Sequence, residues 1–107
     1  MSYTSQYTPE TLSRDELDQT TGPVVIEFGT NWCGFCKGAQ VDIKAAMDHH
    51  PDVAHVKVED GKGRRLGRTF GIKLWPSLIF LKDGEEMARV VRPENRHDIE
   101  DALDKIH

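Results

Sequence analysis

The feature that most constrains this chain is an abrupt change of pattern at two closely spaced cysteines. Residues 24–29 form an almost continuous apolar, β-branched run that begins after a Gly-Pro pair, as expected for a strand buried on both faces. From Cys33 to His49, apolar residues instead recur at steps of three and four, which predicts a helix. The sequence therefore places Cys33 and Cys36 where a buried strand gives way to the first turn of a helix.

The remaining elements are predicted from local capping, alternation and turn signals. In chain order they are a short helix with a capping box at Ser13, a strand over 53–58, a helical turn around Leu66, strands over 78–81 and 87–91 joined by the hairpin turn Lys82-Asp83-Gly84-Glu85, and a final helix with Asn95 as its N-cap. The final helix is expected to bury Ile99, Ala102, Leu103 and Ile106.

This order of elements predicts an α/β fold. A strand–helix–strand unit followed by a hairpin and a closing helix gives a mixed central β-sheet flanked by helices on both faces. A length of 107 residues suits one domain, residues 1–107, within which the segment 1–21 is the least well defined by these patterns. With 37% hydrophobic and 30% charged residues, the composition is that of an ordinary globular protein.

Charge and hydropathy narrow the class of partner. A net charge of −4 argues against nucleic acid or an anionic membrane, and no apolar stretch approaches the roughly 20 residues that cross a bilayer. The N-terminal residues 1–6 show no secretory signal, so we expect a cytoplasmic monomer. In a reducing compartment, two cysteines at this spacing are expected to perform chemistry or bind metal rather than hold the fold together.

The run Trp32-Cys33-Gly34-Phe35-Cys36-Lys37 at the strand–helix junction resembles the active site of the thioredoxin family. The resemblance extends over residues 22–106 and rests also on Glu27 in the first buried strand, Lys57 in the second, Trp75-Pro76-Ser77 and the hairpin turn over 82–85. It implies a thioredoxin fold and a thiol–disulfide oxidoreductase that reduces protein disulfides. The redox centre would be the Cys33–Cys36 disulfide, with no bound cofactor or metal. The implied partners are protein disulfide substrates and a thioredoxin reductase or another dithiol donor.

The start of a helix favours an anion, so Cys33 is expected to be the exposed attacking thiol. Cys36, one helical turn later, would then resolve the mixed disulfide. Glu27 lies in an apolar strand, where burial is expected to raise its pKa, and we expect it to take the proton of Cys36 with Lys57 as its partner. The alternative for Glu27 and Lys57 is a purely structural ion pair.

The resemblance also implies a substrate-binding surface formed by Trp32, Gly34, Phe35, Trp75 and Pro76. Pro76 is expected to follow a cis peptide bond, so that the Trp75 backbone can pair with an extended substrate. The indoles of Trp32 and Trp75 would form an apolar surface around the dithiol. The alternative for either tryptophan, Trp32 above all, is a position mainly in the core.

Three residues depart from the family pattern, which usually has Asp, Pro and Gly where this chain has Glu27, Phe35 and Arg92. If the Phe35 N–H points at the Cys33 sulfur, it favours the thiolate and raises the redox potential by some tens of millivolts. Arg92 changes the docking surface and favours acidic or otherwise different substrates, unless it is simply solvated.

Other signals carry less weight. The basic residues Lys62, Arg64, Arg65 and Arg68 are interpreted as a solvated face, and the adjacent His49 and His50 point different ways, which makes them poor co-ligands for a metal.

Three other functions remain open from the sequence: a more oxidising disulfide oxidase or isomerase, a binding or chaperone-like scaffold with little redox turnover, and a metal or iron–sulfur site completed by a second copy.

Overall fold

A computed structural model describes residues 3–9 and 12–107; Met1, Ser2, Glu10 and Thr11, all in the segment 1–21, lie outside the described residues. The elements in chain order are α1 (Arg14–Asp18), β1 (Pro23–Gly29), α2 (Gly34–Asp48), β2 (Ala54–Glu59), α3 (Arg65–Thr69), β3 (Ser77–Lys82), β4 (Glu85–Val91) and α4 (Arg96–Leu103). The order and type of these elements agree with the prediction, and their bounds differ from it by one to a few residues.

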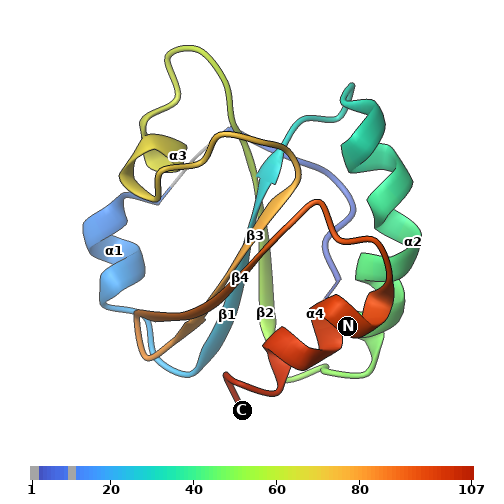
Figure 1. The fold of residues 1–107 in the computed structure, drawn as a ribbon. Coiled ribbons are helices and arrows are strands. Elements are labelled where there is room, and N and C mark those ends of the chain that lie inside the picture. The colour runs from blue at the N-terminus through green and yellow to red at the C-terminus, as the bar shows by residue number, and fades with distance from the viewer. Residues whose placement is uncertain (1–2, 10–11) are drawn as a thin grey trace.

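The four strands form one mixed sheet in the order β2-β1-β3-β4. β1 runs parallel to β2 and antiparallel to β3, and β3 pairs with β4 across the hairpin. Helices α1 and α3 cover one face of the sheet, and α2 and α4 cover the other (Figure 1). The prediction of an α/β fold with helices on both faces is therefore confirmed.

The alternating side chains of β1 explain why this strand lies in the middle. Val25 joins the core beneath α2 and α4, whereas Val24, Ile26 and Phe28 join the core beneath α1 and α3. Every residue from Val24 to Gly29 is buried, as the apolar run predicts. Glu27 shares the face of β1 that carries Val25, so it lies on the α2 side of the sheet.

Local signals fix most element boundaries. Ser13 and Glu16 form the predicted capping box of α1, and the side chain of Asn95 accepts a hydrogen bond from the Asp98 N–H at the start of α4. Asp83 and Gly84 have φ values of +51° and +82°, as a tight two-residue hairpin requires. The prediction that Ile106 belongs to the last helix is wrong. α4 ends at Leu103, and Ile106 lies after the helix, where its side chain still joins the core beneath α2 and α4.

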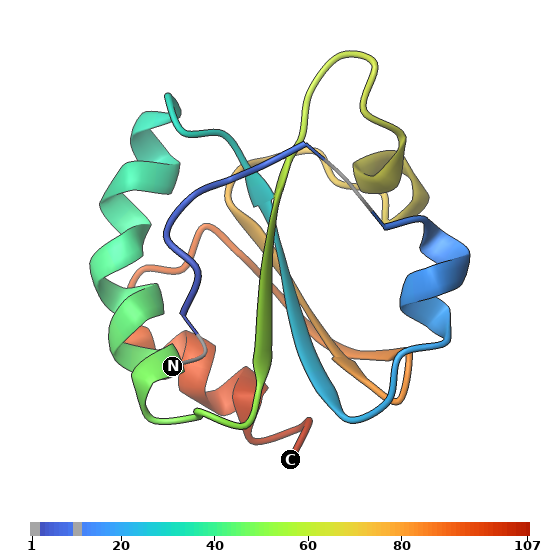
Figure 2. The ribbon, with the colours of Figure 1, turned by 180° about the vertical axis from the view of Figure 1, so that it is seen from behind.

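The N-terminal segment runs alongside β2 and reaches the same face as α2 (Figure 2). Thr8 forms a parallel bridge with Val58; its N–H donates to the Lys57 carbonyl at 3.3 Å, and its carbonyl accepts from the Glu59 N–H at 2.8 Å. This pairing places Tyr7 over the sheet, where it is buried. The segment therefore contributes a residue to the region around the two cysteines.

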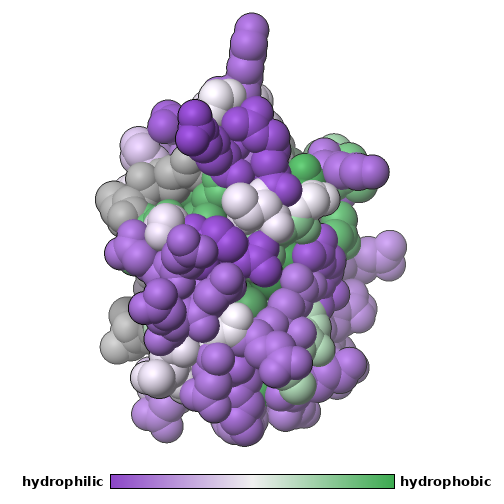
Figure 3. Space-filling view, turned by 90° about the vertical axis from the view of Figure 1, so that its left-hand side faces the viewer, coloured by the Kyte–Doolittle hydropathy of each residue, from purple (hydrophilic) through white to green (hydrophobic). Residues whose placement is uncertain are grey.

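The opposite face, over α1 and α3, is covered mainly by hydrophilic side chains, with small hydrophobic areas between them (Figure 3). The basic residues around α3 lie on this side, and one of them, Arg64, pairs with Glu59 at 2.5 Å. Among the described helices, none has both the length and the apolar character needed to cross a bilayer.

Candidate active site

The Cys33 sulfur caps the start of α2. Cys33 has the extended backbone of an N-cap residue, and its Sγ accepts a hydrogen bond from the Cys36 N–H at 3.3 Å. Both cysteines are free thiols. The prediction of an exposed attacking thiol is wrong in degree: Cys33 is 9% exposed and Cys36 is 1% exposed, because both pack with Tyr7 and Trp75. Cys33 is nevertheless the more accessible of the two.

Cys36 is held as a neutral thiol. Burial, followed by its hydrogen bond with Cys33, raises the pKa of Cys36 to about 12, while contacts with the Thr30 backbone and the Tyr7 phenol act in the opposite direction. The electrostatic interaction with Cys33 also raises this pKa. Two of the influences that keep Cys36 protonated therefore come from Cys33 itself.

Strand register explains which buried polar residues gather behind the dithiol. In the parallel β1–β2 pair, Glu27 lies opposite Lys57, and Val25 lies opposite His55. Alternate residues of a strand share a face, so Glu27, His55 and Lys57 all point toward α2. All three side chains are buried. The pairing of Glu27 with Lys57 was predicted from the sequence. His55, which shares a face of β2 with Lys57, was overlooked.

The Glu27 carboxylate has four polar partners. Oε1 lies 2.8 Å from His55 Nε2, while Oε2 accepts hydrogen bonds from the Tyr7 hydroxyl and, at 2.9 Å, from Gln40 Nε2. Lys57 Nζ is farther away, 3.7 Å from Oε2. Burial acts to raise the pKa of Glu27, but His55, Lys57 and Tyr7 together outweigh it and lower that pKa below its ordinary value. The predicted rise in the Glu27 pKa is therefore wrong, because the buried carboxylate is surrounded by groups that stabilise its negative charge.

Lys57 makes its closest contacts elsewhere. Its Nζ donates to Gln40 Oε1 at 2.6 Å and to the Ser5 carbonyl at 3.1 Å. Burial lowers the pKa of Lys57, while Glu27 and Cys36 oppose that change. Gln40 therefore links Lys57 to Glu27, and this link was not predicted because nothing in the helical pattern of α2 marks a glutamine as special.

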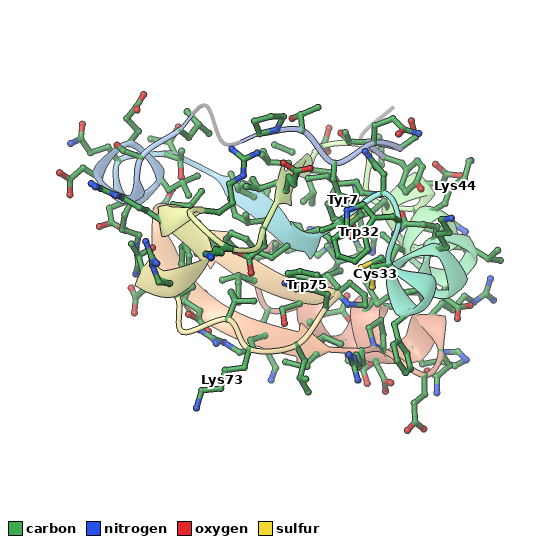
Figure 4. The ribbon with its side chains drawn as sticks, turned by 90° about the horizontal axis from the view of Figure 1, so that it is seen from above. Tyr7, Trp32, Cys33, Lys44, Lys73 and Trp75 are labelled. Atoms are coloured by element: carbon green, nitrogen blue, oxygen red, sulfur yellow. The ribbon has the colours of Figure 1, made fainter. Side chains whose placement is uncertain are left out.

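Tyr7 lies between the buried Glu27 carboxylate and the Cys36 thiol. Its hydroxyl bonds Glu27 and also interacts with Cys36, and burial followed by these groups strongly raises the pKa of Tyr7. Asn31 fixes the Tyr7 backbone by accepting from its N–H at 2.9 Å and donating to its carbonyl at 3.0 Å. Tyr7, Trp32, Cys33 and Trp75 lie close together beside α2 in the view from above (Figure 4).

Two tryptophans form the rim of this site. Trp32 is 70% exposed, which excludes the alternative of a core position, and its ring meets Trp75 edge-on with centroids 5.8 Å apart. Trp75 Nε1 donates to Asp60 Oδ2 at 2.8 Å, and the Trp75–Pro76 peptide bond is cis, as predicted. Gly34, between the cysteines, is exposed at the same rim.

Phe35 and Arg92 contact each other beside the dithiol. The Arg92 guanidinium carbon lies 3.9 Å from the Phe35 ring centroid, and Arg92 Nε donates to the Trp75 carbonyl at 2.8 Å. The hydrogen bond to the Cys33 sulfur comes from the Cys36 N–H, not from the Phe35 N–H. The predicted rise in redox potential through Phe35 therefore loses its structural basis.

Residues 3–9 and 12–107 contain one group of three potential metal ligands. The ligand atoms of His50, Asp104 and His107 lie within 4.8 Å of one another. His50 follows the end of α2, a helix about 22 Å long that begins at the dithiol. The group is thus remote from Cys33 and Cys36, and it pairs His50 with His107 rather than with His49.

Comparisons with known proteins agree with this geometry. The family model for thioredoxin matches residues 5–105. The solved structure of reduced thioredoxin 2 from Pseudomonas aeruginosa PAO1 superposes with a TM-score of 0.86 at 49% identity, covering 97% of this chain and 96% of that one. Thioredoxin 1 of Synechococcus elongatus is 29% identical over 106 residues, which are 98% of both proteins. Thioredoxin H2-1 of Oryza sativa subsp. japonica is 34% identical over 77 residues, 72% of this chain but only 56% of the rice protein. The chain belongs to the thioredoxin family.

Proposed function

We propose that this protein reduces protein disulfides through Cys33 and Cys36. The observation that carries the proposal is the position of the Cys33 sulfur as the N-cap of α2, where it accepts the Cys36 N–H. A helix N-terminus favours a thiolate, which is the nucleophilic form of cysteine. Trp75 packs against the cluster that contains this sulfur, and its ring meets that of Trp32. These two residues and Pro76 would receive the substrate.

In the first step, the Cys33 thiolate attacks one sulfur of the substrate disulfide. The substrate S–S bond breaks, its second sulfur leaves as a thiolate with the electron pair, and Cys33 becomes joined to the substrate in a mixed disulfide. This step consumes the negative charge of Cys33. Both influences by which Cys33 raises the pKa of Cys36 then disappear, so the second thiol becomes easier to ionise once the first has reacted.

In the second step, Cys36 attacks the Cys33 sulfur of the mixed disulfide. A Cys33–Cys36 disulfide forms, and the substrate sulfur leaves as the second thiolate, which completes a two-electron reduction of the substrate. A dithiol donor, such as a thioredoxin reductase, would then return both cysteines to thiols. We propose a cytoplasmic location, because this direction of exchange requires a reducing compartment.

The proton of Cys36 has a route through Tyr7 to Glu27. Tyr7 interacts with Cys36 on one side and donates to Glu27 Oε2 on the other, so its hydroxyl can pass one proton while receiving another. Because the pKa of Glu27 is lowered, its carboxylate is ionised and free to accept at neutral pH. The same low pKa means that Glu27 holds the proton only briefly before it passes to solvent or to the departing thiolate.

Insulin reduction with NADPH and a thioredoxin reductase tests the proposal. We expect turnover by the wild-type protein and none by Cys33→Ser, with Lys73→Gln, which changes a residue remote from the dithiol (Figure 4), as the matched control. Turnover with dithiothreitol but not with the reductase would identify a different electron donor and retain the proposal. Absence of turnover with both donors would reject it in favour of a scaffold role.

A further inference from the structure

A groove of about 790 Å³ opens beside the dithiol, between the first turns of α2 and the segment that follows β4. Phe35 and Ala39 form its apolar α2 side, and Arg92 with Pro93 forms the other side. Phe35 is 62% exposed and presents its aromatic ring to the groove. The groove thus offers an apolar surface and one cation beside Gly34 and Phe35, the two residues between the cysteines.

Arg92 is held in a defined position rather than solvated. Its backbone has φ +49°, its N–H donates to the Pro76 carbonyl at 2.9 Å, and its Nε donates to the Trp75 carbonyl at 2.8 Å. Its guanidinium stacks on Phe35 at 3.9 Å. Trp75 packs against the cluster that contains both cysteines, and Phe35 lies between them in the sequence, so these contacts hold Arg92 between two residues that flank the dithiol.

The Arg92 charge has no acidic partner in the described part of the chain. The ion pairs of the described residues involve Arg14, Lys44, His49, His55, Lys57, Arg64 and Arg89, but not Arg92. Nε is engaged by Trp75, which leaves the terminal guanidinium nitrogens for another acceptor. A planar guanidinium with two free nitrogens matches a carboxylate in a bidentate pair.

The residues that line the groove carry charges of both signs. Asp42 follows Phe35 by seven positions on α2, about 10 Å farther along the helix axis. Glu94 lines the groove on the other side, after Arg92 and on the way to α4. The positive charge of Arg92 therefore lies over Phe35 in the first turn of α2, and the negative charge of Asp42 lies farther along that helix.

We propose that this groove is a substrate subsite that binds an extended protein segment with an acidic residue next to its reactive cysteine. The carboxylate would pair with Arg92, its aliphatic stem would lie on Phe35, and a basic residue farther along the segment would face Asp42 and Glu94. The proposal rests on the disulfide reductase function above and names the substrate class of the same site. Arg92 is a specificity-determining residue in this account, because it contacts substrate without taking part in sulfur exchange.

Two peptides of identical composition test the order of charges. Each has one cysteine joined by a disulfide to thionitrobenzoate; one places glutamate beside the cysteine and lysine at the far end, and the other exchanges them. Attack by the Cys33 thiolate on the peptide sulfur breaks the S–S bond and releases the yellow thionitrobenzoate anion. Equal net charge removes any difference due to long-range attraction, so the ratio of rate constants reports the subsite.

We expect the wild-type protein to react about tenfold faster with the peptide that has glutamate beside cysteine. Arg92→Gln should bring the ratio close to one, whereas Lys73→Gln, which removes a cation far from the site (Figure 4), should leave it unchanged. Added salt should lower the wild-type ratio, which tests the electrostatic origin without any variant.

A wild-type ratio near one, with normal release from both peptides, would overturn the subsite and leave the reductase proposal intact. An unchanged ratio in Arg92→Gln would also overturn it. Failure to release thionitrobenzoate from both peptides would instead overturn the reductase function, and the subsite with it.

Discussion

His55 Nε2 lies 2.8 Å from Glu27 Oε1, and both side chains are completely buried. This contact and the Tyr7 hydrogen bond occupy opposite oxygens of one carboxylate, so Glu27 joins a buried imidazole to the residue that touches the resolving thiol. A carboxylate with these partners is stable in its ionised form inside the protein. Glu27 is a structural centre of this region and, in the proposed mechanism, a proton acceptor; the predictions below separate these roles.

Replacing His55 by Leu is expected to destabilise the protein by about 3 kcal/mol, because it removes the partner that lies 2.8 Å from Oε1 of a buried carboxylate. The substitution should also raise the pKa of Glu27, because His55 contributes most to lowering that pKa and burial opposes it. Denaturant unfolding and NMR titration of the carboxyl group measure the two effects. Exposed His97 provides the control substitution His97→Leu; equal effects of the two variants would contradict this account.

Replacing Tyr7 by Phe removes the hydroxyl between Glu27 and Cys36. Attack by Cys33 should keep its rate, while release of product by Cys36 should slow by about a hundredfold, the usual size of a general-base contribution. Rapid-quench analysis of mixed-disulfide formation and decay separates the steps. Tyr3→Phe is the matched control, because the Tyr3 hydroxyl bonds Gln40 and not Cys36. Equal slowing of both steps in Tyr7→Phe would argue for a general structural defect instead.

Gly29→Ala should disturb the same pair of groups from the other side. A Cβ on Gly29 would lie 2.6 Å from Cys36 Sγ and 2.8 Å from the Tyr7 hydroxyl, so one of them must move. We expect a loss of about 1–3 kcal/mol in the free energy of unfolding, together with slower product release. Gly38→Ala, on the open side of α2, should instead stabilise by about 0.5–1 kcal/mol. An unchanged free energy of unfolding in Gly29→Ala would show that Gly29, Cys36 and Tyr7 are packed less tightly than these distances indicate.

The lowered pKa of Glu27 determines how stability depends on pH. A carboxyl whose pKa is lower in the folded state stabilises the protein fully above its ordinary value of 4.5, and this contribution is lost as pH falls below that value. Wild-type protein should therefore exceed Glu27→Gln in unfolding free energy at neutral pH, by about 3–5 kcal/mol. The difference should shrink on acidification below pH 4.5. A difference that grows with acidification would mean that the Glu27 pKa is raised.

The sequence predicts those parts of the fold that depend on neighbours along the chain. The capping residues Ser13 and Asn95 and the turn at Asp83 each act through hydrogen bonds or backbone angles within a few positions, so local pattern suffices. The apolar run over 24–29 likewise marks β1, because burial on both faces needs no knowledge of the partner strands.

The environment of Glu27 was harder to predict, since it is assembled from distant segments. Tyr7 arrives through the bridge between Thr8 and Val58, a pairing of single residues that leaves no periodic signal. His55 could have been found from the alternation of β2, but its contact with Glu27 depends on strand register. Without these partners, burial alone gives the wrong direction for the Glu27 pKa.

The central claim is that Cys33 attacks substrate and Cys36 releases it. Mass spectrometry of Cys36→Ser and Cys33→Ser proteins after exposure to a disulfide substrate tests this most directly. We predict a stable mixed disulfide at Cys33 in Cys36→Ser and no comparable adduct in Cys33→Ser, where the remaining thiol is 1% exposed and has a pKa of about 12. An adduct at Cys36 that forms as fast as the one at Cys33 would contradict the claim.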